Sequence, residues 1–432
     1  MKLLRSFSIF TIASFINKGM MFAIIPFLTN VMSPEQNGIL SLFGVFVMLM
    51  VPFTLLGFSN SIVMEYPQLS KKEFGFFFTS SLALSTFAFL ILFLLFLILG
   101  STIAPMLGVP YKLLLWGLLY AYGNVYFEGV LAYMRSTDKA ISFFCLSIGK
   151  GLIELGLILW LVIDAKRGAE GKVLASLIGV ATIFIFSTFI FIKNGLLTSV
   201  IKMAYLKMEL KFGISQIFFQ LNLFVLASTD KMMISHLLND KAGLGIYFVA
   251  NQFAYLINVL ISAFFISFQP QLYYYLSNLT IDNRYKLVRI KYLFIAFLFI
   301  CTLLLCLATP LIYHLFIKNI VYHAGIAYVA WNAFAFFFWG LYALFLGYLY
   351  YYRKNKVVIL FSVFGSLICI LLNYIFISQY KIMGAAYADL LTYIILFVAI
   401  VITFRKVVKI DLPWFDFKRL FNYRVLLNPV TS

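Results

Sequence analysis

Seven charged residues interrupt long apolar stretches of the sequence: Lys18, Glu128, Lys150, Glu154, Asp230, Lys231 and Asp389. If those stretches cross a membrane, each charge near the bilayer centre costs about 2.5–3.5 kcal/mol, so it must meet an opposite charge or water. Ammonium groups in a wet cavity attract anions, above all phosphate groups. Because burial disfavours the charged form of a carboxyl group, the acids are candidates to carry a coupling proton.

Position within the stretches divides these residues into two sets. Lys18 and Lys150 lie near the middle of their stretches, and Lys231 shares a helix face with two glutamines that precede it by about three and four turns. We therefore predict that substrate is bound by Lys18, Lys150, Lys231, Gln216 and Gln220. The residues predicted to couple transport to an ion, or to form ion pairs, are Glu128, Glu154, Asp230 and Asp389.

A purely structural interpretation stays open for several of these charges. Lys150 and Glu154 are four residues apart on one helix face, so they can form an ion pair that fixes packing. Asp230 adjoins Lys231 and can do the same, and Asp389 can instead cap the start of a helix. Lys18 has no acid nearby in the sequence, so the prediction that it faces substrate is strongest.

Composition indicates the elements that must position these residues. The chain has 432 residues, of which 64% are hydrophobic and 11% are charged. Soluble domains have about 45–50% apolar and about 25% charged residues, so a soluble globule and a disordered chain are both excluded. One helix needs about 20 apolar residues to cross a bilayer. We predict an all-α polytopic membrane protein whose twelve spans are residues 7–32, 38–64, 74–99, 113–134, 141–163, 173–192, 212–238, 242–269, 292–312, 325–352, 357–378 and 384–404.

A weak internal repeat divides the chain into two six-helix halves. Tyr133-Met-Arg135 in the loop before the fifth span is similar to Tyr351-Tyr-Arg353 before the eleventh, 218 residues later. We predict halves at residues 1–192 and 212–404, a cytoplasmic linker at 193–211 and a basic cytoplasmic tail at 405–432. Such parallel repeats occur in transporters. Arg135 and Arg353 occupy equivalent loops, and we predict that they form a cytoplasmic gate.

The distribution of basic residues predicts the orientation. With the N-terminus placed in the cytoplasm, the loops and termini on that side hold 23 Lys and Arg, and the opposite loops hold 7. Cytoplasmic loops of membrane proteins collect such residues, so both termini are predicted to be cytoplasmic. The same rule accounts for the net charge of +18 without nucleic-acid binding. The four cysteines and three histidines show no metal-ligand spacing, and we expect neither a metal nor a cofactor.

Several short segments resemble one transporter family. Residues 26–30 read Pro-Phe-Leu-Thr-Asn and residues 33–38 read Ser-Pro-Glu-Gln-Asn-Gly. The seventh span carries Asp-Lys-Met-Met-Ile at 230–234, followed by Gly-Ile-Tyr-Phe-Val-Ala at 245–250, and Asn373 precedes Gly-Ala-Ala at 384–386. These segments are similar to the polysaccharide-unit (Wzx-type) flippases of the multidrug/oligosaccharidyl-lipid/polysaccharide exporter (MOP) superfamily.

The resemblance implies a V-shaped bundle, like that of the multidrug (MATE) transporters, which opens alternately to each side of the bacterial inner membrane. It also implies an O-antigen or related repeat unit, linked to undecaprenyl pyrophosphate, as the substrate. A glycan polymerase and a chain-length regulator are the implied protein partners, and membrane lipid surrounds the chain.

Two other functions are compatible with parts of the sequence. A drug or cation antiporter of the same superfamily would favour a net acidic cavity, whereas the central positions here carry Lys18 and Lys150. A membrane glycan polymerase would need a sizeable outer loop, and every predicted outer loop is short. The sequence contains no Walker A motif, which argues against ATP-driven transport by this chain alone. We therefore predict a flippase and not an enzyme.

Overall fold

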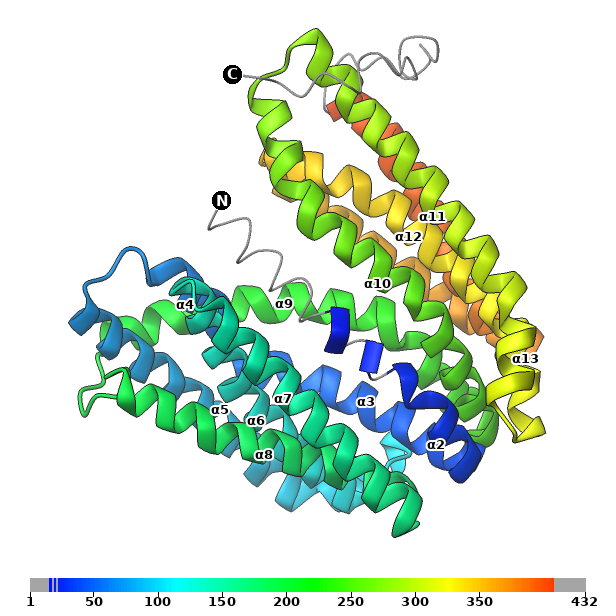
Figure 1. Ribbon diagram of the computed structural model, residues 1–432, viewed down its shortest axis with the longest axis horizontal. Coiled ribbons are helices and arrows are strands. Elements are labelled where there is room, and N and C mark those ends of the chain that lie inside the picture. The colour runs from blue at the N-terminus through cyan, green and yellow to red at the C-terminus, as the bar shows by residue number, and fades with distance from the viewer. Residues whose placement is uncertain (1–14, 18, 21, 408–432) are drawn as a thin grey trace.

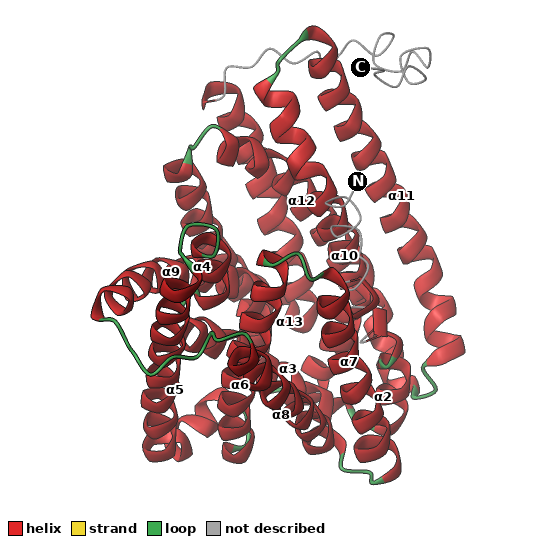
Figure 2. Cartoon of the chain, turned by 60° about the vertical axis from the view of Figure 1, so that its left-hand side comes forward, coloured by secondary structure: helices red, strands yellow, loops and turns green. Residues whose placement is uncertain are grey.

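The computed structural model describes residues 15–17, 19, 20 and 22–407, and within them every regular element is a helix (Figures 1 and 2). The first group of helices comprises α2 (Ile25–Val31), α3 (Pro34–Leu55), α4 (Phe58–Glu65), α5 (Lys71–Leu107), α6 (Tyr111–Ser136), α7 (Ala140–Ile158), η1 (Leu159–Asp164) and α8 (Gly168–Lys193). The second comprises α9 (Met203–Met233), η2 (Ile234–Leu238), α10 (Lys241–Ser277), α11 (Ile281–Phe316), η3 (Ile320–Gly325), α12 (Ile326–Tyr351) and α13 (Asn355–Val407).

The apolar composition of these helices confirms a multi-pass membrane protein. Nine helices in the described part of the chain are long and apolar enough to cross a membrane. One of them, α13, contains Lys381 in the left-handed region with φ of 53°, so it consists of two helices joined by a tight turn. Helix α6, with 26 residues, falls outside the nine, and most of the predicted first span lies outside the described residues. The count of twelve spans therefore stays a prediction.

Local sequence signals explain where several helices begin. The Ser33 hydroxyl accepts a hydrogen bond from the Gln36 backbone N–H, and the Gln36 side-chain oxygen accepts one from the Ser33 backbone N–H. Pro34 follows as the first residue of α3. Ser70 and Thr280 cap α5 and α11 in the same way through their hydroxyl groups. These caps fix the ends of long helices. Inside lipid, every backbone N–H and C=O group of such a helix must be hydrogen-bonded within the protein.

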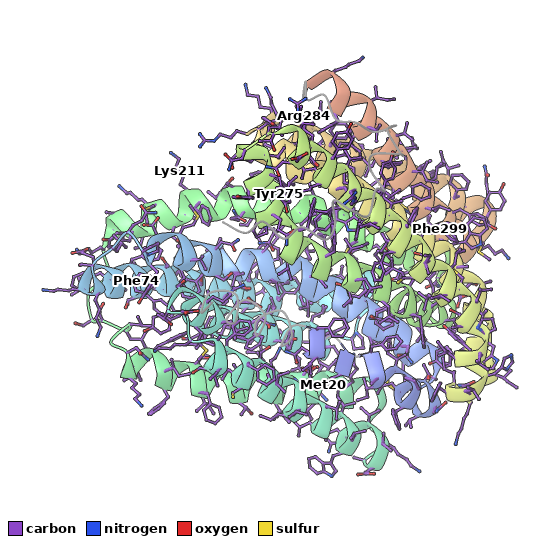
Figure 3. The ribbon with its side chains drawn as sticks, turned by 45° about the horizontal axis from the view of Figure 1, so that its top comes forward. Met20, Phe74, Lys211, Tyr275, Arg284 and Phe299 are labelled. Atoms are coloured by element: carbon purple, nitrogen blue, oxygen red, sulfur yellow. The ribbon has the colours of Figure 1, made fainter. Side chains whose placement is uncertain are left out.

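The two groups of helices form the two lobes of a V, which agrees with the predicted architecture (Figure 1). Helices α5 to α8 lie in one lobe and α10 to α13 in the other, and Phe74 and Arg284 mark the ends where the lobes diverge (Figure 3). We call this the linker end, because it carries the connections 66–70, 137–139, 194–202, 278–280 and 352–354. The opposite, turn end carries the connections 32–33, 108–110, 165–167, 239–240 and 317–319 together with Lys381.

The lobes meet at the turn end through α3 and α10. A Cβ atom placed on Gly38 of α3 would overlap the carbonyl oxygen of Lys241, and one placed on Gly245 of α10 would overlap the carbonyl oxygen of Pro34. The seam therefore has a glycine on each side facing the other helix's backbone. The side-chain amide of Asn37 donates to the Tyr322 hydroxyl over 2.6 Å, which adds a hydrogen bond between the lobes.

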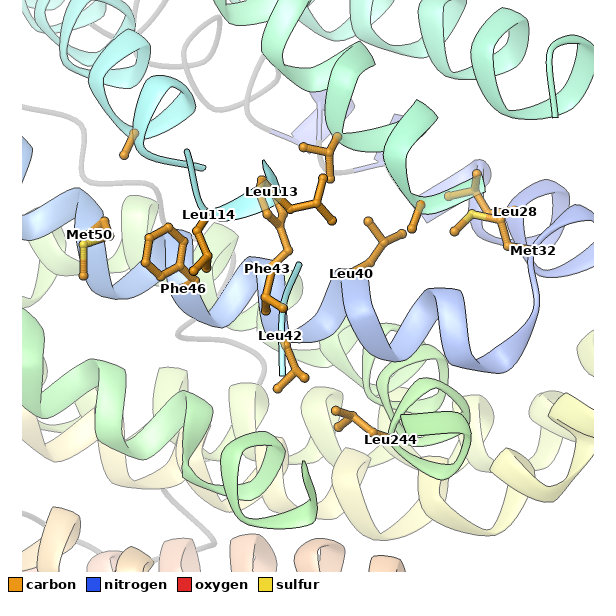
Figure 4. Packing of buried hydrophobic residues seen from close by; sticks show 14 of the residues in the cluster. Leu28, Met32, Leu40, Leu42, Phe43, Phe46, Met50, Leu113, Leu114 and Leu244 are labelled. Atoms are coloured by element: carbon orange, nitrogen blue, oxygen red, sulfur yellow. The ribbon is translucent and has the colours of Figure 1, made fainter. Parts of the chain in front are cut away.

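Apolar side chains extend the seam between the lobes. Leu28, Met32, Leu40 and Leu42 of the first lobe belong to the same buried cluster as Leu244 of α10 (Figure 4). This packing closes the V at one end while the linker ends stay apart.

Helix α9 joins the lobes, and it begins earlier than the sequence predicted. It starts at Met203, so residues 203–211 of the predicted linker are helical. The linker end of α9 is attached to the first lobe, because the Lys202 ammonium bonds the Glu73 carboxylate over 2.8 Å and the Ser61 hydroxyl bonds Glu209 over 2.9 Å. Its opposite end packs on α13 in the second lobe.

Candidate functional site

A cavity of about 370 Å³ lies between the lobes, and we call it the cationic cavity. Among the described residues, its charged side chains are Lys150 and Glu154 from α7 and Lys172 from α8. The opposite wall comes from α10 and includes Phe248, Gln252 and Tyr255. Two ammonium groups and one carboxylate give this lining a net positive charge.

The charged groups of the cationic cavity are held in different ways. The Lys150 ammonium lies 4.5 Å from the centre of the Phe127 ring and 5.6 Å from that of Tyr120, where the ring faces attract a cation. Glu154 is 7% exposed and accepts a hydrogen bond from the Ser176 hydroxyl. In the described part of the chain, Lys150 and Glu154 form no ion pair within 4.0 Å. The structure therefore does not support the interpretation that these two residues pair to fix helix packing.

The predicted first span reaches this cavity. The side-chain amide of Asn17 bonds the Ser147 hydroxyl over 2.6 Å, which ties the span to α7 one turn before Lys150, and Asn17 also lines the cavity. The neighbouring Lys18, which the sequence predicted to bind substrate, lies outside the described residues.

A second cavity of about 670 Å³ lies in the other lobe, and we call it the amide cavity. It is lined by α9, α10, α12 and α13, with Met48 of α3 at its border, and its polar side chains include Asn251, Gln252, Asn258 and Asn332. Phe248, Gln252 and Tyr255 line both cavities, so the two adjoin across one face of α10.

The predicted acids Asp230 and Asp389 belong to the second lobe with Lys231. The Lys231 ammonium lies 3.1 Å from the Asp230 carboxylate, so these neighbours form the expected ion pair, and Asp230 is 3% exposed. Asp389 accepts a hydrogen bond from the Tyr247 hydroxyl over 3.4 Å. Lys231 and Asp389 line the amide cavity. Asp389 lies two turns beyond the break at Lys381 and therefore does not cap the start of a helix.

The remaining predicted residues lie toward the linker end. Arg135 and Gln216 line a third cavity of about 590 Å³, where Gln216 also accepts a hydrogen bond from Asn60 over 3.5 Å. Gln220 and Arg353 line neither the cationic cavity, nor the amide cavity, nor this third cavity, and Arg353 lies in the other lobe from Arg135. Half-buried Glu128 experiences the charges of Arg135 and Lys150. The two gate arginines are thus not brought together in this conformation.

Sequence reasoning missed several polar residues of these cavities. Lys172 lies one residue before the predicted sixth span, 173–192, but α8 already begins at Gly168. Asn251 and Asn258 are seven residues apart in an apolar span, and this helical spacing was the available signal. Glu209, 1% exposed, was also missed: it lies outside these cavities, in the stretch that the sequence assigned to the linker, and accepts a hydrogen bond from Ser61.

Comparison with known proteins identifies the family and the fold. The family model described as "Polysaccharide biosynthesis protein" matches residues 3–272. No curated protein matches the chain significantly. Among solved structures, the chain is similar to the lipid II flippase MurJ in an inward closed conformation, with 17% identity and a TM-score of 0.69 over 95% of this chain and 89% of that one.

Two further solved structures share this fold. An inward-facing multidrug resistance MATE family transporter of the MOP superfamily has 12% identity and a TM-score of 0.67, covering 91% of this chain and 96% of that one. A MOP superfamily transporter from Pyrococcus furiosus has 13% identity and a TM-score of 0.57 over 93% and 95% of the two chains. By name, these three structures are one flippase and two transporters. The chain therefore belongs to the polysaccharide biosynthesis protein family and has the fold of the MOP superfamily.

Proposed function

We propose that this protein flips oligosaccharide repeat units linked to undecaprenyl pyrophosphate across the bacterial inner membrane by alternating access. The observation that carries the proposal is the cationic cavity, which lies between two lobes that are closed at one end and apart at the other. A pyrophosphate carries about two negative charges and must lose water on entering a membrane protein. Lys150 and Lys172 offset that loss by charge-assisted hydrogen bonds.

The family and the structural relatives support a lipid-linked substrate. The family model names polysaccharide biosynthesis, and a similar structure is a lipid II flippase. A net positive cavity suits a lipid pyrophosphate better than a cationic drug, so the flippase is favoured over a drug antiporter. O-antigen units of lipopolysaccharide are the substrates proposed here, and a glycan polymerase and a chain-length regulator are the proposed partners that receive the flipped unit.

The proposed orientation places the linker end and both termini in the cytoplasm. It is supported by the 23 Lys and Arg that the sequence assigns to that side against 7 on the other. Fusions of a reporter that is active only in the cytoplasm should be active after Lys202 and Lys354 and inactive after Arg167 and Lys318. Activity after Lys318 together with inactivity after Lys202 would reverse the orientation.

Within this proposal, the substrate moves from the linker end to the turn end. Arg135 and Arg353 are proposed to approach each other when the linker end closes, and Glu128, Glu154, Asp230 and Asp389 are the candidate carriers of a coupling ion. Lys18 is proposed to complete the cationic cavity, and Gln216, Gln220 and Lys231 to contact the substrate along α9.

Deletion of the gene tests the proposed function. The deleted strain should accumulate a prenyl-pyrophosphate oligosaccharide in the inner leaflet and lose the surface polysaccharide, because the unit is made but not flipped.

Complementation with Lys18→Ala should fail, and Lys18→Arg should restore part of the polysaccharide. Asp389→Asn should give flipping in vesicles that no longer responds to a proton gradient.

Mass spectrometry of the lipid extract and a blot for surface polysaccharide measure the outcome, with membrane levels of the protein as the control. Unchanged polysaccharide, with loss of resistance to cationic dyes instead, would favour the drug antiporter.

A further inference from the structure

One face of α10 presents a row of polar side chains to the amide cavity. Asn251, Tyr255, Asn258 and Ser262 follow one another by four, three and four residues, which places them on one helix face, and all four line the cavity. Gln252 stands at the edge of the row, where the two cavities adjoin. In the described part of the chain, the side-chain amides of Asn251, Gln252 and Asn258 make no hydrogen bond to protein.

Three unbonded amides are unusual in a helix of this composition. A polar group taken out of water without a partner costs free energy, so such groups are generally hydrogen-bonded in folded proteins. Here the amides are half-buried and face a volume of about 670 Å³, so their partners must come from inside the cavity. An amide offers both donors and an acceptor, which suits a ligand rich in hydroxyl groups.

The part of the cavity wall that comes from α12, the neighbour of α10, is aromatic. Phe336 and Trp339 of α12 line the cavity beside the small residues Ala335 and Ala343. The Trp339 ring packs against two tyrosines, with its centre 5.6 Å from that of Tyr342 and 5.5 Å from that of Tyr393. A flat apolar surface and a row of amides lining the same cavity match a sugar ring, which has an apolar face and polar edges.

The charges in the lining balance one another. Lys231 and Asp389 are the charged residues of the lining in the described part of the chain, and they have opposite signs. Lys231 is also paired with Asp230, while Asp389 accepts a hydrogen bond from Tyr247. The amide cavity therefore lacks the excess of positive charge that the adjoining cationic cavity has, and it does not favour an anionic group.

We propose that the amide cavity binds an uncharged sugar of the lipid-linked substrate. This inference rests on the proposed flippase function and adds to it a division of labour, in which the cationic cavity takes the pyrophosphate and the amide cavity takes the glycan. The hydroxyl groups of the sugar bond Asn251 and Asn258, and its apolar face packs on Trp339. Because the cavities adjoin at Gln252 and Tyr255, one molecule spans both.

Binding of matched probes to the full chain in lipid nanodiscs tests this proposal. The probes are farnesyl pyrophosphate, the same compound carrying N-acetylglucosamine, the same compound carrying glucuronic acid, and methyl N-acetylglucosaminide. The double variant Asn251→Ala/Asn258→Ala should bind the N-acetylglucosamine compound roughly tenfold more weakly, because it loses two neutral hydrogen bonds. Its affinity for farnesyl pyrophosphate should not change, and the parent should bind the glucuronic acid compound less tightly than the uncharged one.

Ser262→Ala is the matched control on the same helix face. The Ser262 hydroxyl already donates to the Asn258 carbonyl oxygen over 2.8 Å, so its removal should leave all four affinities unchanged. Trp339→Leu should weaken binding of the N-acetylglucosamine compound, and Trp339→Phe should restore part of it.

Two results would overturn the inference. One is unchanged binding of the N-acetylglucosamine compound by the double variant, which would mean that water, and not the sugar, bonds the amides. The other is tighter binding of the glucuronic acid compound than of the uncharged one by the parent. If methyl N-acetylglucosaminide binds in an Asn251-dependent way but farnesyl pyrophosphate does not bind, the sugar site stands and the flippase function fails. If no probe binds, both fail.

Discussion

Replacing Gly38 by alanine should stop transport although the protein inserts and folds. The added methyl group would overlap the backbone carbonyl oxygen of Lys241, so α3 and α10 could no longer approach as they do at the turn end. Overpacking of a tight contact costs about 1–3 kcal/mol, and a bias of that size shifts a two-state equilibrium by about 5–150-fold. Gly245→Ala should have the same effect, because its methyl group would overlap the carbonyl oxygen of Pro34.

The conformational shift can be measured directly. Spin labels at Ala165 and Lys318, which are exposed and belong to different lobes at the turn end, should show a longer distance in Gly38→Ala than in the parent protein. Transport of the lipid-linked unit should fall by about 5–150-fold in parallel, since each 1.4 kcal/mol of bias toward the opened turn end depletes the closed state tenfold.

Gly44→Ala is the matched control, because it lies on the same helix and a Cβ atom there has no neighbour within 4 Å. The control should transport normally and keep the parent distance. Normal transport by Gly38→Ala and Gly245→Ala would show that the seam does not take part in alternating access.

The fold was predictable because the bilayer leaves the chain few choices. A 20-residue apolar stretch must satisfy its backbone internally, so its hydropathy predicts a helix with little help from tertiary contacts. The break at Lys381 illustrates this, since it separates the two helices of α13 at the turn that the sequence predicted between the last two spans. The start of α9 was predicted less well, because residues 203–211 are basic and amphipathic but still form a helix, held by Glu73 and Ser61.

The functional site was predictable only in part, because its walls come from distant parts of the chain. Lys150 and Glu154 stood out as charges in an apolar span, and both line the cationic cavity. No local pattern indicates that Gln252 lies opposite them, a hundred residues later. The seam glycines were also hidden, since their close approach to Lys241 and Pro34 exists only when the lobes have packed.

Removing the ammonium groups of Lys150 and Lys172 from the cationic cavity should abolish flipping. Lys150→Gln/Lys172→Gln keeps the side chains polar and nearly as long but leaves Glu154 as the charged residue of the described lining. A hydrogen bond to a charged group contributes about 1.5–3 kcal/mol, so the loss of two should weaken pyrophosphate binding by at least a hundredfold. Binding of farnesyl pyrophosphate to the full chain in nanodiscs measures this loss, and surface polysaccharide in the complemented deletion strain measures its consequence.

Charge, and not side-chain size, should decide the outcome. Lys150→Arg keeps a cation beside the Phe127 ring and should retain part of the transport, although a planar guanidinium differs in shape from an ammonium. Lys112→Gln is the matched control, because Lys112 also lies over an aromatic ring, Trp116 at 4.6 Å, but at the exposed turn end outside the cavity. If the double variant binds farnesyl pyrophosphate as the parent does, the cavity is not the pyrophosphate site. If Lys112→Gln is as defective as the double variant, the defect reflects the loss of any lysine of this lobe and not the cavity's charge.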